Sequence, residues 1–157
     1  MEEVPFRLVH RQQRTNGHGF TFFHGKRPCP PGRLVGMAVS FYSIVVDAHD
    51  LPSQARFWCR VLDWKMLFEA DDEIVIGADK DAVPGITFVP VPEGKTVKNR
   101  LHIDLAPDDQ AVEVARIIGL GATRADVGQR ADASWVVLAD PEGNEFCVLS
   151  PKNSLID

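Results

Sequence analysis

The sequence predicts an α+β domain built from two copies of a strand-helix-strand-strand-strand (βαβββ) module. Short strand-like runs surround only two amphipathic helical segments, and these segments follow the same order in both halves of the chain. The residues that begin the two helices, Asp50 and Asp109, lie 59 positions apart. We therefore expect module one at residues 41–91 and module two at 100–150, inside one domain of residues 39–152.

Module one begins with the β-rich run FYSIVVD at residues 41–47. The predicted helix comes next, with Asp50 as a favourable N-cap, Pro52 in the first turn and apolar residues at helical spacing as far as Leu62. Acidic and proline-containing turns then separate three further strand-like runs, at residues 64–70, 73–78 and 85–91.

Module two follows the polar linker 92–99 and repeats this order. A strand is predicted at 100–106 and a capped amphipathic helix at 107–121, ending at a glycine. Three strands follow at 122–128, 134–140 and 145–150. The sequence DPEGNE between the last two is typical of a hairpin turn, because proline presets the turn and glycine or asparagine supplies positive φ.

The first 38 residues differ from the rest in pattern and charge, and we predict that they form a disordered extension. Residues 1–36 carry six Lys or Arg against two Glu, a charge of +4, which leaves −9 for the remainder of a chain whose net charge is −5. An acidic domain is a poor surface for phosphates, so nucleic-acid binding is not expected. Met37 directly precedes the first strand and is a candidate start of the native protein.

Composition fits one soluble domain: 157 residues, 45% hydrophobic and 25% charged. The three cysteines contain no Cys-x-x-Cys pair, which argues against a disulfide framework and favours a reducing compartment. No apolar run approaches the roughly 18 residues that span a bilayer. We therefore predict a cytoplasmic protein without membrane partners.

Strand alternation separates the side chains of each sheet into two faces. In LHIDL the leucines and the isoleucine share one face, while His102 and Asp104 lie on the other. In YSIVVD the corresponding polar residues are Ser43 and Asp47. Apolar faces must pack on the helices, so the polar ones are expected to line a cleft. The 59-residue offset also makes Phe88 the counterpart of Cys147 in module one, so both are expected to face that cleft.

These segments carry a family resemblance. ARFWCRVLDW, NRLHIDL and VVLADPEGNEFCVL, within residues 40–151, resemble the glyoxalase/bleomycin-resistance/extradiol-dioxygenase group, the vicinal oxygen chelate superfamily, and its glyoxalase-like domain proteins. The resemblance implies that the two modules form an incomplete barrel with a concave ligand cleft. It also implies that metal ligands, where the family has them, fall at Ser43, Phe88, His102 and Cys147.

This sequence departs from the metal-dependent pattern. A catalytic metal needs about three protein donors, and of the four implied positions only His102 is a good one. Phe88 cannot coordinate, and Cys147 stands where the resemblance implies a carboxylate. We therefore predict no metal cofactor. A divalent metal held by His102 with unconventional partners, Asp47 or Asp104 among them, is the alternative.

Two roles remain open for His102: a general acid or base oriented by Asp104, or a residue that only shapes the pocket. Trp135 and Phe88 suggest an aromatic wall, and Arg100 could receive an anionic group of the ligand. The predicted ligand-binding residues are Ser43, Asp47, Phe88, Arg100, His102, Asp104, Trp135 and Cys147.

The leading functional hypothesis is metal-independent binding or sequestration of a small organic molecule in the cleft. The alternative is an enzyme, a metal-dependent lyase, isomerase or dioxygenase that uses His102. A third class is an accessory module that makes protein contacts, as a homodimer, through exposed sheet edges.

Overall fold

The computed structural model describes residues 39–152 and 154–155. The predicted disordered extension, residues 1–38, and the candidate start at Met37 lie outside the described residues. Within them, neither helix is long and apolar enough to cross a membrane.

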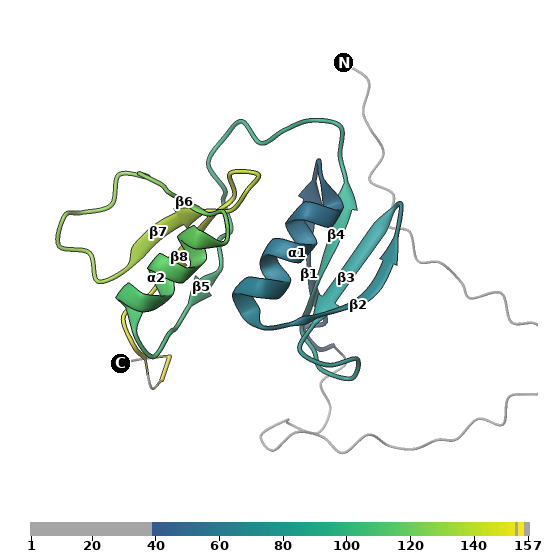
Figure 1. Cartoon of the computed structure of the whole chain (residues 1–157), viewed down its shortest axis with the longest axis horizontal. Coiled ribbons are helices and arrows are strands. Elements are labelled where there is room, and N and C mark those ends of the chain that lie inside the picture. The colour runs from purple at the N-terminus through teal and green to yellow at the C-terminus, as the bar shows by residue number, and fades with distance from the viewer. Residues whose placement is uncertain (1–38, 153, 156–157) are drawn as a thin grey trace, which may run out of the picture. The chain divides into compact units, whose positions relative to one another are not determined.

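The described chain has the predicted α+β architecture of two βαβββ modules (Figure 1). Each module forms a four-stranded sheet, in the order β1-β4-β3-β2 in module one and β5-β8-β7-β6 in module two. The first and last strands of each module pair in parallel, and the other neighbours are antiparallel. Module one comprises β1 (Ser43–Ala48), α1 (Leu51–Leu62), β2 (Lys65–Ala70), β3 (Glu73–Gly77) and β4 (Gly85–Pro90); module two comprises β5 (Asp104–Leu105), α2 (Gln110–Gly119), β6 (Thr123–Arg124), β7 (Val136–Ala139) and β8 (Glu145–Val148).

Two strands of module two are shorter than the sequence predicts. The strand expected at 100–106 pairs with β8 only at Asp104 and Leu105, and the one expected at 122–128 pairs with β7 only at Thr123 and Arg124. After Arg124 the chain enters a loop, residues 125–135, before β7 begins. An apolar or β-branched run therefore becomes a strand only as far as a neighbouring strand runs alongside it.

Helix α1 begins as predicted and is held at both ends by module two. The Asp50 carboxylate accepts a hydrogen bond from the Ser53 amide at 3.0 Å, and a proline stands in the first turn. From module two, the Glu142 carboxylate accepts the amides of His49 and Asp50 at 2.9 and 2.6 Å. Arg116 of α2 donates to the carbonyls of Arg60 and Val61, both at 2.9 Å. An anion at the N-terminus and a cation at the C-terminus both complement the helix dipole.

One hydrophobic cluster joins the two modules. It contains residues of α1, β3 and β4 together with residues of α2, β7 and β8. At its centre Phe57 and Trp58 of α1 pack against Phe146 of β8, with ring centroids 6.3 and 5.1 Å away. Phe146 is 2% exposed. The aromatic side chains of α1 therefore complete a core that module one does not fill alone.

The DPEGNE turn between β7 and β8 forms part of the same junction. Asp140, which opens the turn, is 3% exposed and accepts hydrogen bonds from Gln54 Nε2 and from Trp58 Nε1. Its carboxylate also accepts the amides of Glu142 and Asn144, at 3.0 and 2.8 Å. Burial raises the pKa of Asp140, because the charged form loses hydration, and these donors act in the opposite direction. The predicted hairpin turn is therefore also a polar connection to α1.

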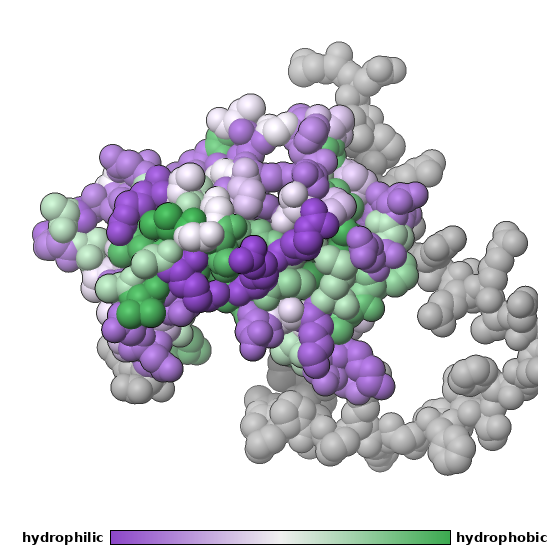
Figure 2. Space-filling view, in the orientation of Figure 1, coloured by the Kyte–Doolittle hydropathy of each residue, from purple (hydrophilic) through white to green (hydrophobic). Residues whose placement is uncertain are grey.

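Helix α2 buries one side and leaves the other in solvent. Val114 and Ile117 are buried against the sheet, whereas Val112 and Ile118 are exposed. Figure 2 shows hydrophobic surface in the region where Figure 1 places this helix. This division between the two sides is the amphipathic pattern that the sequence predicts for residues 107–121.

The strand registers correct one sequence prediction. In module one Val45 pairs with Thr87 and Val46 with Phe88, whereas in module two Asp104 pairs with Cys147. Asp104 lies 59 positions after Val45, but Cys147 lies 60 positions after Thr87. Module two therefore has one more residue between its first and last strands, and in a strand a shift by one residue moves a side chain to the opposite face.

The fixed 59-residue offset predicts that Phe88 and Cys147 share a face. This prediction is wrong, because the two side chains lie on opposite faces of their sheets. Phe88 is fully buried in the hydrophobic core, and Thr87 is the residue of module one that corresponds to Cys147.

Candidate functional site

Two pockets share His102 and Glu145 at their boundary. The junction pocket, of about 300 Å³, lies between β1, α1 and the stretch that precedes β5. The module-two pocket, of about 380 Å³, lies on the face of the second sheet that carries His102 and Asp104. Both volumes fall at the lower end of the range usual for small-molecule sites.

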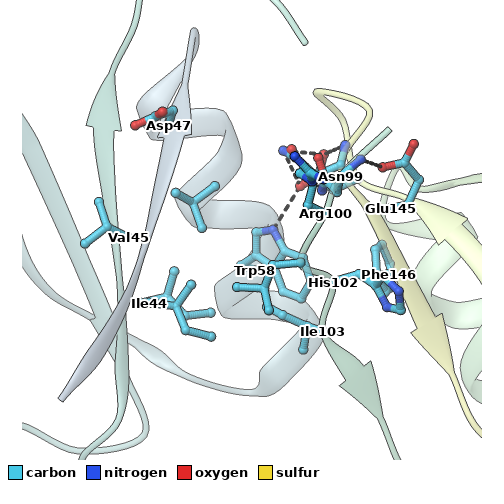
Figure 3. A pocket seen from close by; sticks show the side chains of 15 residues that line it. Ile44, Val45, Asp47, Trp58, Asn99, Arg100, His102, Ile103, Glu145 and Phe146 are labelled. Atoms are coloured by element: carbon cyan, nitrogen blue, oxygen red, sulfur yellow. Dashed lines mark hydrogen bonds between the residues drawn. The ribbon is translucent and has the colours of Figure 1, made fainter. Parts of the chain in front are cut away.

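The junction pocket is mostly apolar. In Figure 3, Ile44 of β1, Trp58 of α1 and Ile103 surround it, while Val45 and Asp47 leave β1 on the side away from Trp58. Its innermost polar group is Asp140, whose oxygens are occupied by the donors of the DPEGNE turn and of α1. Arg100 lies at its edge and is exposed. The polar groups deep in this pocket therefore already have partners within the protein.

The module-two pocket combines an apolar wall with exposed polar groups. Val127, Val137 and Leu149 are apolar, and Trp135 lines the pocket with 42% of its surface exposed. The polar side is formed by Lys98, His102, Asp104, Gln129, Glu145 and Cys147. Glu145 has a partner already, since Lys95 Nζ lies 2.9 Å from its carboxylate.

His102, Asp104 and Cys147 converge in this pocket. His102 Nδ1 lies 3.5 Å from Asp104 Oδ1 and 3.8 Å from Cys147 Sγ. The ligand atoms of the three residues all lie within 4.8 Å of one another. His102 and Asp104 are exposed and Cys147 is buried. Their convergence follows from register, because Asp104 pairs with Cys147 across β5 and β8 and His102 precedes Asp104 by two positions on the same face.

The cluster does not form a nucleophile-base-acid relay. Such a relay needs the thiol and the carboxylate on different nitrogens of the imidazole, and here both face Nδ1. Burial, reinforced by the negative charge of Asp104, raises the pKa of the Cys147 thiol to about 11. A thiol in this environment stays protonated at neutral pH and is a poor nucleophile.

Replacement of Asp104 by asparagine is expected to make Cys147 more reactive. Loss of the carboxylate charge lowers the pKa of the thiol, so alkylation by iodoacetamide at pH 9 should be several-fold faster. Peptide mass spectrometry would follow Cys147 separately, with Cys59 as internal reference and Asp71→Asn, at an exposed position in the β2–β3 turn of module one, as control. An unchanged or slower rate at Cys147 would contradict this assignment of the pKa shift.

The structure brings together only part of the predicted site. His102, Asp104, Trp135 and Cys147 share the module-two pocket, whereas Asp47 and Arg100 line the junction pocket. Ser43 lines neither, and Phe88 lies in the core. The residues that sequence reasoning missed belong to the loop 125–135, namely Val127, Gly128 and Gln129, with Lys98 from the linker. No periodic signal marks these positions, because a loop has no repeating face.

The corresponding face of module one lacks this chemistry. The row Asp104, Cys147 and Val137 in the second sheet corresponds to Val45, Thr87 and Val75 in the first. No ionisable side chain stands in the module-one row. The duplicated fold therefore carries its polar cluster in one half only.

Fold and site together define a duplicated βαβββ protein with a ligand-sized pocket on a sheet face. The sequence matches the glyoxalase-like domain family over residues 43–149, and the chain belongs to that family. No curated protein sequence matches it significantly.

Solved structures share the fold at low sequence identity. A glyoxalase/bleomycin resistance protein/dioxygenase family enzyme from Burkholderia phytofirmans PsJN superposes with a TM-score of 0.58 at 16% identity, covering 73% of this chain and 100% of that one. A fosfomycin resistance protein from Listeria monocytogenes, complexed with Mn(II) and 1S,2S-dihydroxypropylphosphonic acid, gives 0.58 at 12%, covering 74% and 93%. A bleomycin-binding protein complexed with bleomycin gives 0.50 at 16%, covering 73% and 100%. The resemblance to this superfamily and the predicted fold class are confirmed.

Proposed function

We propose that the protein binds a small, partly apolar organic molecule in the module-two pocket, without a metal ion. The observation that carries this proposal is the composition of the pocket. An apolar wall that includes the half-exposed Trp135 faces a few converging polar side chains, His102 and Asp104 among them. Ligand sites commonly combine an apolar lining with a small number of orienting polar groups.

Two proteins of the same fold support the type of ligand that we propose. The bleomycin-binding protein, which shares the fold, was solved with bleomycin, and the fosfomycin resistance protein was solved with Mn(II) and an organic phosphonic acid. They support binding of a small organic molecule, whereas absence of a metal rests on the residues of this chain. The donor set supports the metal-free form, because Ser43 lines neither pocket and Phe88 lies in the core, so only His102 and Cys147 of the four implied ligand positions meet here. Binding and sequestration need no reacting group, only a pocket of complementary shape and polarity.

A screen of small organic compounds by thermal shift and tryptophan fluorescence tests the proposal. We expect at least one compound to raise the melting temperature, since a ligand at 100 times its Kd adds about 2.7 kcal/mol of stability. His102→Ala should weaken the binding of that compound. Ser43→Ala, at the matching position of module one, should leave its binding unchanged. A screen without a stabilising compound, or equal effects of both substitutions, would contradict binding in this pocket.

A metal-dependent enzyme is the second candidate, favoured by the convergence of His102, Asp104 and Cys147. Imidazole nitrogen, carboxylate oxygen and thiolate sulfur together suit zinc. These three residues would hold the ion. Once bound, a zinc ion would supply Lewis-acid chemistry to a lyase or isomerase reaction; these are two of the three reaction classes, with dioxygenase, that the alternative hypothesis names for His102.

Metal dependence separates the two candidates. For a metal-independent binder, ligand affinity should be the same after dialysis against EDTA as after addition of Zn²⁺. Metal content of the purified protein, measured by mass spectrometry, should be well below one ion per chain. Stoichiometric zinc that is lost in His102→Ala and in Cys147→Ser, but kept in the matched control Thr87→Ala, would favour the enzyme.

A further inference from the structure

The loop 125–135 is the largest difference between the two modules. In module one, Asp71 and Asp72 alone connect β2 to β3. In module two, the corresponding strands β6 and β7 are connected by residues 125–135. This loop contributes Val127, Gly128, Gln129 and Trp135 to the module-two pocket. One wall of the pocket is therefore specific to the second half of the duplication.

The loop covers the face of the second sheet. Val137 and Cys147 are 4% and 6% exposed, whereas their counterparts in module one, Val75 and Thr87, are only half-buried. Val45, in the same row of module one, is 52% exposed. The part of the face formed by β7 and β8 is thus covered in module two, whereas the β5 side, with His102 and Asp104, stays exposed.

Hydrogen bonds within the loop hold this wall in place. The Gly128 amide donates to Asp126 Oδ1 at 2.9 Å, and the Val127 amide donates to Gln129 Oε1 at 2.8 Å. Gln129 Nε2 in turn donates to the Ala125 carbonyl at 3.2 Å. The Gln129 amide is therefore used inside the loop, and the wall offers the pocket mainly Val127 and the bare backbone at Gly128.

Trp135 stands at the end of the loop and is fixed by its neighbours. The adjacent Ser134 carbonyl accepts a hydrogen bond from Gln110 Nε2 at 3.0 Å, and β7 begins at the next residue, Val136. The indole keeps 42% of its surface exposed within the pocket. A large, positioned aromatic surface left uncovered in a pocket is complementary to another flat, unsaturated surface.

We propose that the loop 125–135 determines the ligand specificity of the module-two pocket, and that the ligand class is a planar unsaturated ring lying against Trp135. This inference rests on the proposed function and narrows it. The polar edge of such a ring would face His102 and Asp104, on the opposite side of the pocket from the loop.

Matched pairs of neutral compounds test the ring preference: phenol with cyclohexanol, benzamide with cyclohexanecarboxamide, and 2-naphthol with decahydro-2-naphthol. Each pair has the same polar group and differs in planarity. Titration calorimetry on the full chain should show the aromatic member binding at least tenfold more tightly. Trp135→Leu keeps an apolar side chain but removes the ring face, and should lose most of this preference. Trp135→Phe should retain it, at an affinity reduced by less than tenfold.

A loop replacement tests the specificity wall. Substituting residues 125–135 by Asp-Asp, the connection of module one, should reduce binding of the aromatic members by about tenfold to a hundredfold; circular dichroism checks that the variant folds.

If saturated members bind as tightly as aromatic ones, or Trp135→Leu keeps the preference, the inference is wrong and the proposed function stands. If no aromatic member binds, the inference is also wrong. The proposed function itself fails only if the wider compound screen yields no ligand whose affinity depends on His102.

Discussion

Replacement of Asp140 by alanine is expected to lower the free energy of unfolding by about 3 kcal/mol. The substitution leaves Gln54 Nε2 and Trp58 Nε1 without their acceptor inside the protein, and it removes the acceptor of two amides in the DPEGNE turn. Buried donors that lose a charged acceptor account for the larger effects of single substitutions. The burial that raises the pKa of Asp140 offsets part of this loss.

Urea denaturation would measure the change, with two further variants for comparison. Asp140→Asn keeps one acceptor oxygen and should lose about half as much stability. Asp132→Ala removes an exposed partner of Arg130 and should change stability by less than about 0.5 kcal/mol. A loss below about 1 kcal/mol for Asp140→Ala would mean that the carboxylate is not a main connection between the modules.

The largest expected effect is that module one, expressed alone as residues 39–98, does not fold. This fragment lacks Phe146, against which Phe57 and Trp58 pack, and large aromatic contacts of this kind are worth about 3–5 kcal/mol. It also lacks Asp140 and the groups of Glu142 and Arg116 at the two ends of α1. Together these losses approach the whole stability of a typical domain.

Circular dichroism of the fragment should show neither stable helix nor a cooperative thermal transition. Mixing it with the complementary fragment, residues 99–157, should restore both, because the contacts between the halves are then available. The single substitution Phe146→Ala provides a graded control, destabilised but folded. Cooperative unfolding of residues 39–98 alone would show that the junction contacts are dispensable.

The duplicated fold could be predicted because its signals are local. N-caps at Asp50 and Asp109, alternating strands and turn residues each depend on a few neighbouring positions, and the structure confirms both helices and the order of the elements. The same alternation places His102 and Asp104 on one face, and in the structure their side chains lie 3.5 Å apart. Cys147 also lies in the predicted pocket, through its pairing with Asp104.

The remaining features depend on distances that no local pattern records. A single additional residue in module two reverses the face predicted for Phe88, and a fixed offset cannot reveal it. The separation of Asp47 and Arg100 from the His102 cluster depends on how α1 and the DPEGNE turn fill the space between the sheets. The role of the loop 125–135 depends on where an aperiodic segment lies against a sheet.

The true correspondence between the two sheets gives a route to engineering. In the first sheet, Ser43, Val45 and Thr87 occupy the positions that His102, Asp104 and Cys147 occupy in the second. The triple substitution Ser43→His, Val45→Asp and Thr87→Cys would therefore place a second copy of the cluster on module one. A graft designed on Phe88 instead would bury its thiol among the side chains that pack on α1.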